Sequence, residues 1–133
     1  TMAAWFKTST MPDNFDALIG KLPSTPPFSG YGIFHYGGGW SCMYWEASGT
    51  SWLSSGLTLN DGNWHQIECR RYNGGATIDI YVDGENVATG DILPTNVDTT
   101  TPLLIGNTTY YIDAGSGYFT GSIDEVLLRD DST

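Results

Sequence analysis

The sequence predicts an all-β fold in which two antiparallel sheets pack face to face. Side chains alternate in type along 65–71 and again along 78–82, so that each segment has one apolar and one polar face. This period of two is typical of antiparallel strands that are covered on one side only. The turns at 73–75 and 83–84 contain Asn-Gly and Asp-Gly, which tolerate the positive φ of tight hairpins. A second sheet must cover the apolar faces, and the result is a β-sandwich.

Composition supports the same fold class. The chain has 17 glycines and 8 tyrosines but few lysines, leucines and alanines, as expected of strands and turns rather than helices. No stretch of ten residues carries a convincing helical period. At 133 residues the chain is long enough for one domain, since folding at this size buries about two-thirds of the unfolded surface.

The first half of the chain is predicted to form short strands separated by loops rich in proline and glycine. Pro12 cannot join a strand ladder, and the proline-rich segment 22–29 is a second loop. Three consecutive glycines at 37–39 form a flexible hairpin connection. Strands are expected at 2–7, 16–21, 31–36, 42–46 and 52–53.

In the second half, two hairpins are followed by irregular segments. The segment 91–101 has no periodicity, and 107–117 is a polar loop with aromatic residues. Strands are expected at 65–71, 78–82, 86–88 and 102–106, with a closing strand within 118–128.

Charge and hydropathy exclude several kinds of partner. The formal net charge is −10, from 15 acidic and 5 basic residues, so phosphate backbones and anionic lipid would repel the chain. We therefore expect no nucleic-acid partner. No apolar run approaches the roughly 20 residues of a membrane span, so we expect no membrane insertion. The chain opens on Thr1 without a signal peptide, and we expect it to be a fragment of a larger protein.

The two cysteines leave two readings open. Cys42 and Cys69 both fall in expected strands, and Cys69 shares the phase of the apolar Ile67. A disulfide and a pair of small buried side chains are about equally consistent with this pattern. Two thiols without ligand-like spacing do not make a zinc site.

Five separated segments follow one another in the order and spacing of a known family. They are AWFKTS at 4–9, LNDGNWHQI at 59–67, IDIYVDGENVATG at 78–90, PLLIGN at 102–107 and YFTGSIDEVLL at 118–128. With these segments the chain resembles a laminin-G-like domain, the concanavalin A-like jelly roll of lectins, pentraxins, glucanases and many bacterial carbohydrate-binding modules. The resemblance implies a single laminin-G-like domain over 1–133. Members usually carry a further strand or two before the first one here, so the resemblance also implies an unpaired edge at the N-terminal strand. Such an edge would be open to a strand-donating or oligomer partner.

Aromatic residues surrounded by Gly and Ser are the main candidates for a ligand site. Flat rings stack on sugar rings, and amides, hydroxyls and carboxylates at their edges bind sugar hydroxyls. Tyr44 and Trp45 face opposite sides of their strand, so both cannot be core; the alternative is that these rings fill the space between the sheets. The candidate ligand-binding residues are Tyr36, Trp40, Tyr44, Trp45, Trp52, Tyr110, Tyr111 and Asn107.

Calcium is the one cofactor that the resemblance implies. Glucanases with this jelly roll often hold a structural calcium on an aspartate of the last strand, and the matching residue here is Asp124. Asp124 interrupts the alternation of its strand, as in a β-bulge. Its alternative role is to bond backbone amides of a neighbouring turn. A rim site using Asp113 is a second possibility, although no loop has the calcium-binding loop signature.

Catalysis is not expected. Retaining glycosidases on this fold place paired carboxylates in an E-x-D-x-x-E run, so that nucleophile and acid lie about 5 Å apart. The sequence has no such run. It therefore predicts a non-catalytic carbohydrate-binding (lectin-like) or adhesion module of an extracellular protein, with a glycan or a surface protein as partner. The alternative is a structural protein–protein interaction module of a virion or cell-surface assembly.

Overall fold

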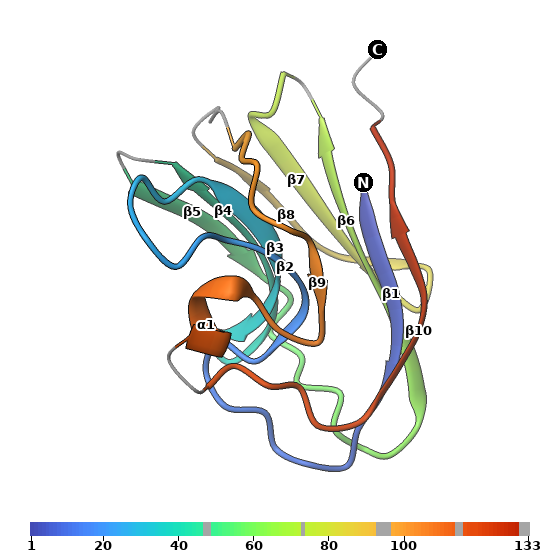
Figure 1. Cartoon of the computed structure of the whole chain (residues 1–133). Helices are drawn as coiled ribbons and strands as arrows, with labels where there is room; N and C mark the ends of the chain where they lie inside the picture. Colours follow the sequence, from blue (N-terminus) through green and yellow to red (C-terminus); the bar gives the residue numbers. More distant parts are fainter. Residues whose placement is uncertain (47–48, 73, 93–96, 114–115, 131–133) are drawn as a thin grey trace.

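The computed structural model describes residues 1–46, 49–72, 74–92, 97–113 and 116–130, without the side chains of 112 and 113. These residues form two five-stranded antiparallel sheets that face each other, with one short helix beside them (Figure 1). The first sheet, called sheet A, has the strand order β10-β1-β6-β7-β8, and the second, sheet B, has the order β5-β4-β3-β2-β9. The predicted all-β sandwich is confirmed.

Most strands lie where the alternation of side chains places them. The elements are β1 (Met2–Lys7), β2 (Ala17–Lys21), β3 (Gly30–Tyr36), β4 (Gly39–Glu46), β5 (Gly49–Ser54), β6 (Trp64–Tyr72), β7 (Thr77–Val82), β8 (Glu85–Asp91), β9 (Leu104–Ile105), α1 (Thr109–Asp113) and β10 (Ser122–Leu128). The flexible hairpin connection expected at 37–39 is a tight turn at Gly37 and Gly38, which both adopt positive φ, and Gly39 already belongs to β4.

Three segments differ from the sequence-based expectation. The strand expected at 102–106 is reduced to Leu104–Ile105, because Pro102 cannot donate to a ladder and Gly106 turns away at a φ of 82°. The closing strand begins only at Ser122. Part of the expected loop 107–117 is the helix α1, which the Thr108 hydroxyl caps by accepting the Tyr111 N–H at 3.1 Å.

A dry core between the sheets is closed by a covalent bridge. Phe6 of sheet A packs on Trp40 of sheet B with ring centroids 5.2 Å apart, and both side chains are fully buried. Cys42 of β4 and Cys69 of β6 form a disulfide, which joins one sheet to the other. Of the two readings that the sequence leaves open, the disulfide is the one the structure shows.

The N-terminal strand is not an edge, and that prediction is wrong. β1 pairs with β10 on one side and with β6 on the other. The C-terminal strand β10 lies beside β1, as Figure 1 shows, so β10 and β8 are the edge strands of sheet A. Leu128 lies opposite the buried Met2 and therefore faces the space between the sheets, yet it is 46% exposed.

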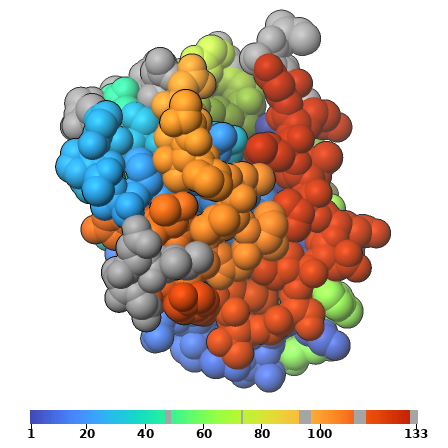
Figure 2. Space-filling model, in the orientation of Figure 1, coloured from blue at the N-terminus to red at the C-terminus, as the bar shows by residue number. Residues whose placement is uncertain are grey.

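The space-filling view shows this side of the molecule, with the 97–107 segment and the C-terminal strand crossing its surface (Figure 2). No helix in the described part of the chain is long and apolar enough to cross a membrane.

Candidate functional site

The outer face of sheet B carries a concentration of aromatic rings. Because Cys42 points inward to its disulfide partner, its neighbour Met43 points outward, and so does Trp45. Trp52 lies opposite Met43 on β5 and shares its face. Six rings on this side, called the aromatic face below, belong to Phe15, Tyr36, Trp45, Trp52, Tyr110 and Tyr111. The fully buried Phe34 ring packs against Trp45 and Tyr111.

A stack of three rings forms one wall of the aromatic face. Phe15 lies between Tyr36 and Tyr111, with centroid separations of 4.8 and 5.3 Å and interplanar angles of 25° and 17°. Tyr36 in turn meets Trp52 edge to face at 4.9 Å, and Tyr110 meets Tyr111 at 4.7 Å. These contacts connect the helix α1 to the hairpin of β4 and β5 through packed rings.

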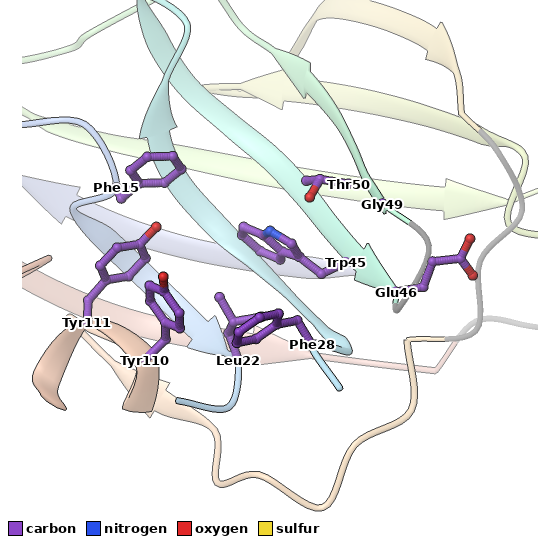
Figure 3. A pocket seen from close by; sticks show the side chains of 9 residues that line it. All are labelled: Phe15, Leu22, Phe28, Trp45, Glu46, Gly49, Thr50, Tyr110 and Tyr111. Atoms are coloured by element: carbon purple, nitrogen blue, oxygen red, sulfur yellow. The ribbon is translucent and has the colours of Figure 1, made fainter. Parts of the chain in front are cut away.

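A hollow of about 400 Å³ opens beside this wall, with the Trp45 indole inside it (Figure 3). Its volume falls within the range of small-molecule sites. Figure 3 shows the phenol rings of Tyr110 and Tyr111 rising from α1 on one side and the Glu46 carboxylate on the opposite side. The residues that line it are Phe15, Leu22, Phe28, Trp45, Glu46, Gly49, Thr50, Tyr110 and Tyr111.

Backbone geometry at two positions holds the wall in place. Phe15 has a φ of 71°, which is costly for a residue with a side chain, and its N–H donates to the His35 carbonyl at 2.8 Å. Gly37 lies under the Trp52 ring, where a Cβ would approach that ring to 2.6 Å. A side chain at Gly37 would therefore displace Trp52.

The Tyr111 phenol of the hollow remains a hydrogen-bond donor at neutral pH. Burial raises the pKa of Tyr111 far above its usual value, and the neighbouring phenols of Tyr110 and Tyr36 raise it further. A neutral phenol both donates and accepts, which suits sugar hydroxyls.

Three of the sequence-predicted ligand residues are structural instead, and those predictions are wrong. The Trp40 ring is 0% exposed, and its indole N–H donates to the Thr58 carbonyl at 2.8 Å. Tyr44 faces the core, where burial raises its pKa to about 12. The buried Asn107 amide donates to the Ser116 carbonyl and accepts the Thr108 N–H, at 3.0 and 2.7 Å. None of the three can reach a ligand on the aromatic face.

The other five predicted residues, Tyr36, Trp45, Trp52, Tyr110 and Tyr111, are brought together on the aromatic face. Phe15 was missed from the sequence. Its only signal is a lone aromatic residue in a polar loop, and its position depends on the positive φ described above.

The two predicted metal ligands lie on different elements, Asp124 on β10 and Asp113 at the end of α1. Asp124 lies at the predicted bulge beside Glu125, which has a φ of 47°, and its carboxylate accepts the Glu125 N–H at 2.8 Å. The Asp113 side chain lies outside the described residues. In the described part of the chain no three His, Cys, Asp or Glu side chains lie close enough to hold a metal ion. Calcium binding stays a prediction, which a calcium titration of the unfolding temperature would test.

Fold and site together define a two-sheet jelly-roll domain with an aromatic, partly hollowed outer face. The family model of the concanavalin A-like lectin/glucanases superfamily matches residues 1–132, and the chain belongs to that family. The predicted laminin-G-like resemblance is thereby confirmed. No curated protein sequence matches the chain.

Two solved structures have the same fold. Domain 4 of AbnA, a GH43 extracellular arabinanase from Geobacillus stearothermophilus in complex with arabinotriose, superposes with a TM-score of 0.67 at 16% identity. The match covers 94% of this chain and 57% of that one. Domains LG4-5 of the mouse laminin alpha1 chain give a TM-score of 0.61 at 19% identity, over 94% of this chain and 34% of that one. At these identities the likeness shows the fold alone.

Proposed function

We propose that the chain is a non-catalytic carbohydrate-binding module of an extracellular protein, which holds a glycan on the aromatic face. The observation that supports it most strongly is the hollow beside the ring wall, where an indole lies among phenol hydroxyls. Rings supply apolar contact with sugar C–H groups, and the phenols supply hydrogen bonds at the sugar edge. An arabinanase domain of this fold, crystallised with arabinotriose, adds support at the level of the fold.

The carboxylates around the hollow favour binding over hydrolysis. Glycoside hydrolysis needs two carboxyl groups about 5 Å apart for retention, or 6.5–9.5 Å apart for inversion. Among the described side chains that line the hollow, Glu46 supplies the single carboxylate. A single shallow site of this kind binds weakly, so several copies on one surface would be needed for firm attachment.

A glycan array probed with the 133-residue chain is the first test. Trp52→Ala should weaken binding to the glycan that the array identifies by about 1–2 kcal/mol, which is roughly 5- to 30-fold in Kd. Trp64→Ala is the matched control, because Trp64 is 43% exposed against 42% for Trp52 but lies on β6 of sheet A. Silence across all sugars, or equal losses in both variants, would contradict the proposal.

The edge strand β10 favours a second candidate function, a protein interaction module that accepts an added strand. An unpaired edge is a template for another strand, and the half-exposed, inward-facing Leu128 gives such a strand an apolar surface to cover. Sedimentation over a range of concentrations tests the self-association form. An oligomer that Leu128→Lys disrupts would support this candidate; a monomer at every concentration would count against it.

A further inference from the structure

We infer that the ligand of the aromatic face is a neutral glycan chain of at least two sugar units, and that acidic glycans are excluded. The inference rests on the proposed function and adds the ligand class to it. Two observations carry it: where the basic side chains lie, and how the indoles of Trp45 and Trp52 are placed.

The chain has five Lys and Arg residues. Three of them, Lys7, Arg70 and Arg71, lie on strands of sheet A. On its outer face, Lys7 lies over the Trp64 ring at 5.5 Å, and Arg70 bonds Glu68 at 2.8 Å. Arg71 points between the sheets, where its guanidinium lies 4.7 Å from the Tyr44 ring centroid. None of these cations is on the side of the molecule that carries the aromatic face.

The other two basic residues do not line the hollow either. Arg129 follows β10, and its backbone N–H donates to the Thr1 carbonyl at 2.9 Å. Lys21 is the last residue of β2 and lies opposite Tyr31, whose ring packs against the core between the sheets. The Lys21 side chain is therefore on the inner face of sheet B. No Lys, Arg or His is among the described residues that line the hollow.

A sulfate or carboxylate in this hollow would lose water without gaining a cation. Burying an unpaired charge is costly, and the Glu46 carboxylate at the rim and the net charge of −10 add repulsion. Hydroxyl groups meet no such penalty, because the phenols of Tyr110 and Tyr111, the Thr50 hydroxyl and the Glu46 carboxylate offer hydrogen-bond partners. The hollow therefore selects uncharged sugars.

The spacing of Trp45 and Trp52 sets a minimum length. In the register of β4 with β5, Trp45 lies opposite Thr50 and Trp52 opposite Met43, so the two indoles are diagonal neighbours on one face. The Cα atoms of such neighbours are about 7–8 Å apart, so successive sugar units, rather than one, would cover the two indoles. A glycan that enters the hollow over Trp45 and continues across β5 would place its next sugar unit on Trp52.

Titration of the chain with two sets of polysaccharides tests the ligand class. The neutral set is arabinan, xylan and β-glucan, and the acidic set is polygalacturonate, hyaluronate and heparin. We expect binding within the neutral set, at least about tenfold tighter than to any acidic member and changed less than about twofold between 50 and 500 mM NaCl. Salt-sensitive binding to an acidic member would overturn the inference and leave the proposed function standing. Binding to neither set, together with silence on the array, would overturn both.

The minimum length of the glycan is tested with the neutral sugar that binds. The oligosaccharide should bind about fivefold or more tightly than its monosaccharide, and Trp52→Ala should reduce that ratio toward one. Trp64→Ala should change neither affinity. Equal affinity for monosaccharide and oligosaccharide, or a length gain that survives Trp52→Ala, would overturn the two-unit site.

Discussion

Removal of the disulfide should cost the domain a large part of its stability. The bridge joins β4 of one sheet to β6 of the other, and its cysteines are 27 residues apart in the sequence. In the chain-entropy model, releasing a loop of this length returns about 12 cal/mol/K to the unfolded chain, or about 3.6 kcal/mol at 25 °C. Domains are stable by only about 5–15 kcal/mol, so the loss is substantial. It corresponds to a fall of roughly 10–15 °C in Tm for a chain of this size.

Urea unfolding of the wild type with and without dithiothreitol measures this cost. The double variant Cys42→Ala/Cys69→Ala is the control, and it should match the reduced wild type and ignore the reductant. Glycan affinity should survive at temperatures where the variant is folded, because the bridge lies on the inner side of β4 and the aromatic face lies on the outer side. Equal unfolding midpoints for oxidised and reduced protein, or two free thiols in the oxidised protein, would refute the reasoning.

Three further predictions concern the core and the two histidines. Trp40→Ala should lower the free energy of unfolding by about 3–5 kcal/mol, since it empties a fully buried site; a calorimetric loss below 1 kcal/mol would be inconsistent with that burial. For His65, partial burial lowers the pKa, but hydrogen bonds to the Asp83 and Asp61 carboxylates, at 2.7 and 2.9 Å, outweigh it and raise the pKa overall. Its stabilisation should therefore be full below about pH 6.5 and be lost as pH rises through the higher folded pKa, and urea midpoints of His65→Gln should lack that decline. For His35, burial lowers the pKa, and neither ring nitrogen has a hydrogen-bond partner among the described residues. The native state should therefore lose stability as pH falls below about 6.5, and His35→Leu should remove this loss; an unchanged acid slope would argue against a neutral buried ring.

Local alternation of side chains is sufficient to predict the sandwich, because it separates the apolar face of a strand from its polar face. It also separates Tyr44 from Trp45, which do point to opposite sides. In β4 both faces carry aromatic rings, so alternation alone does not tell which face is inner there, and the sequence-based assignment of Trp40 fails for that reason. Trp40 shares the phase of Cys42, and the phase of Cys42 becomes inner only through its bond to the other sheet.

Features that depend on non-local pairing or on a single unusual φ lay beyond sequence reasoning. The pairing of β10 with β1 brings residues near the two ends of the sequence side by side, and no local sequence pattern predicts it. Phe15 completes the ring wall through one residue in the left-handed region. The helix α1, with five residues, is too short to show a period.

Ligand footprinting of the tryptophans tests the central claim most directly. The chain is exposed to hydroxyl radicals with and without the bound neutral oligosaccharide, and oxidation of each tryptophan is read by mass spectrometry. The account predicts that the ligand protects Trp45 and Trp52, while Trp64, as exposed as Trp52 but on the other sheet, keeps its rate. Protection of Trp64 with Trp45 and Trp52 unchanged would contradict it.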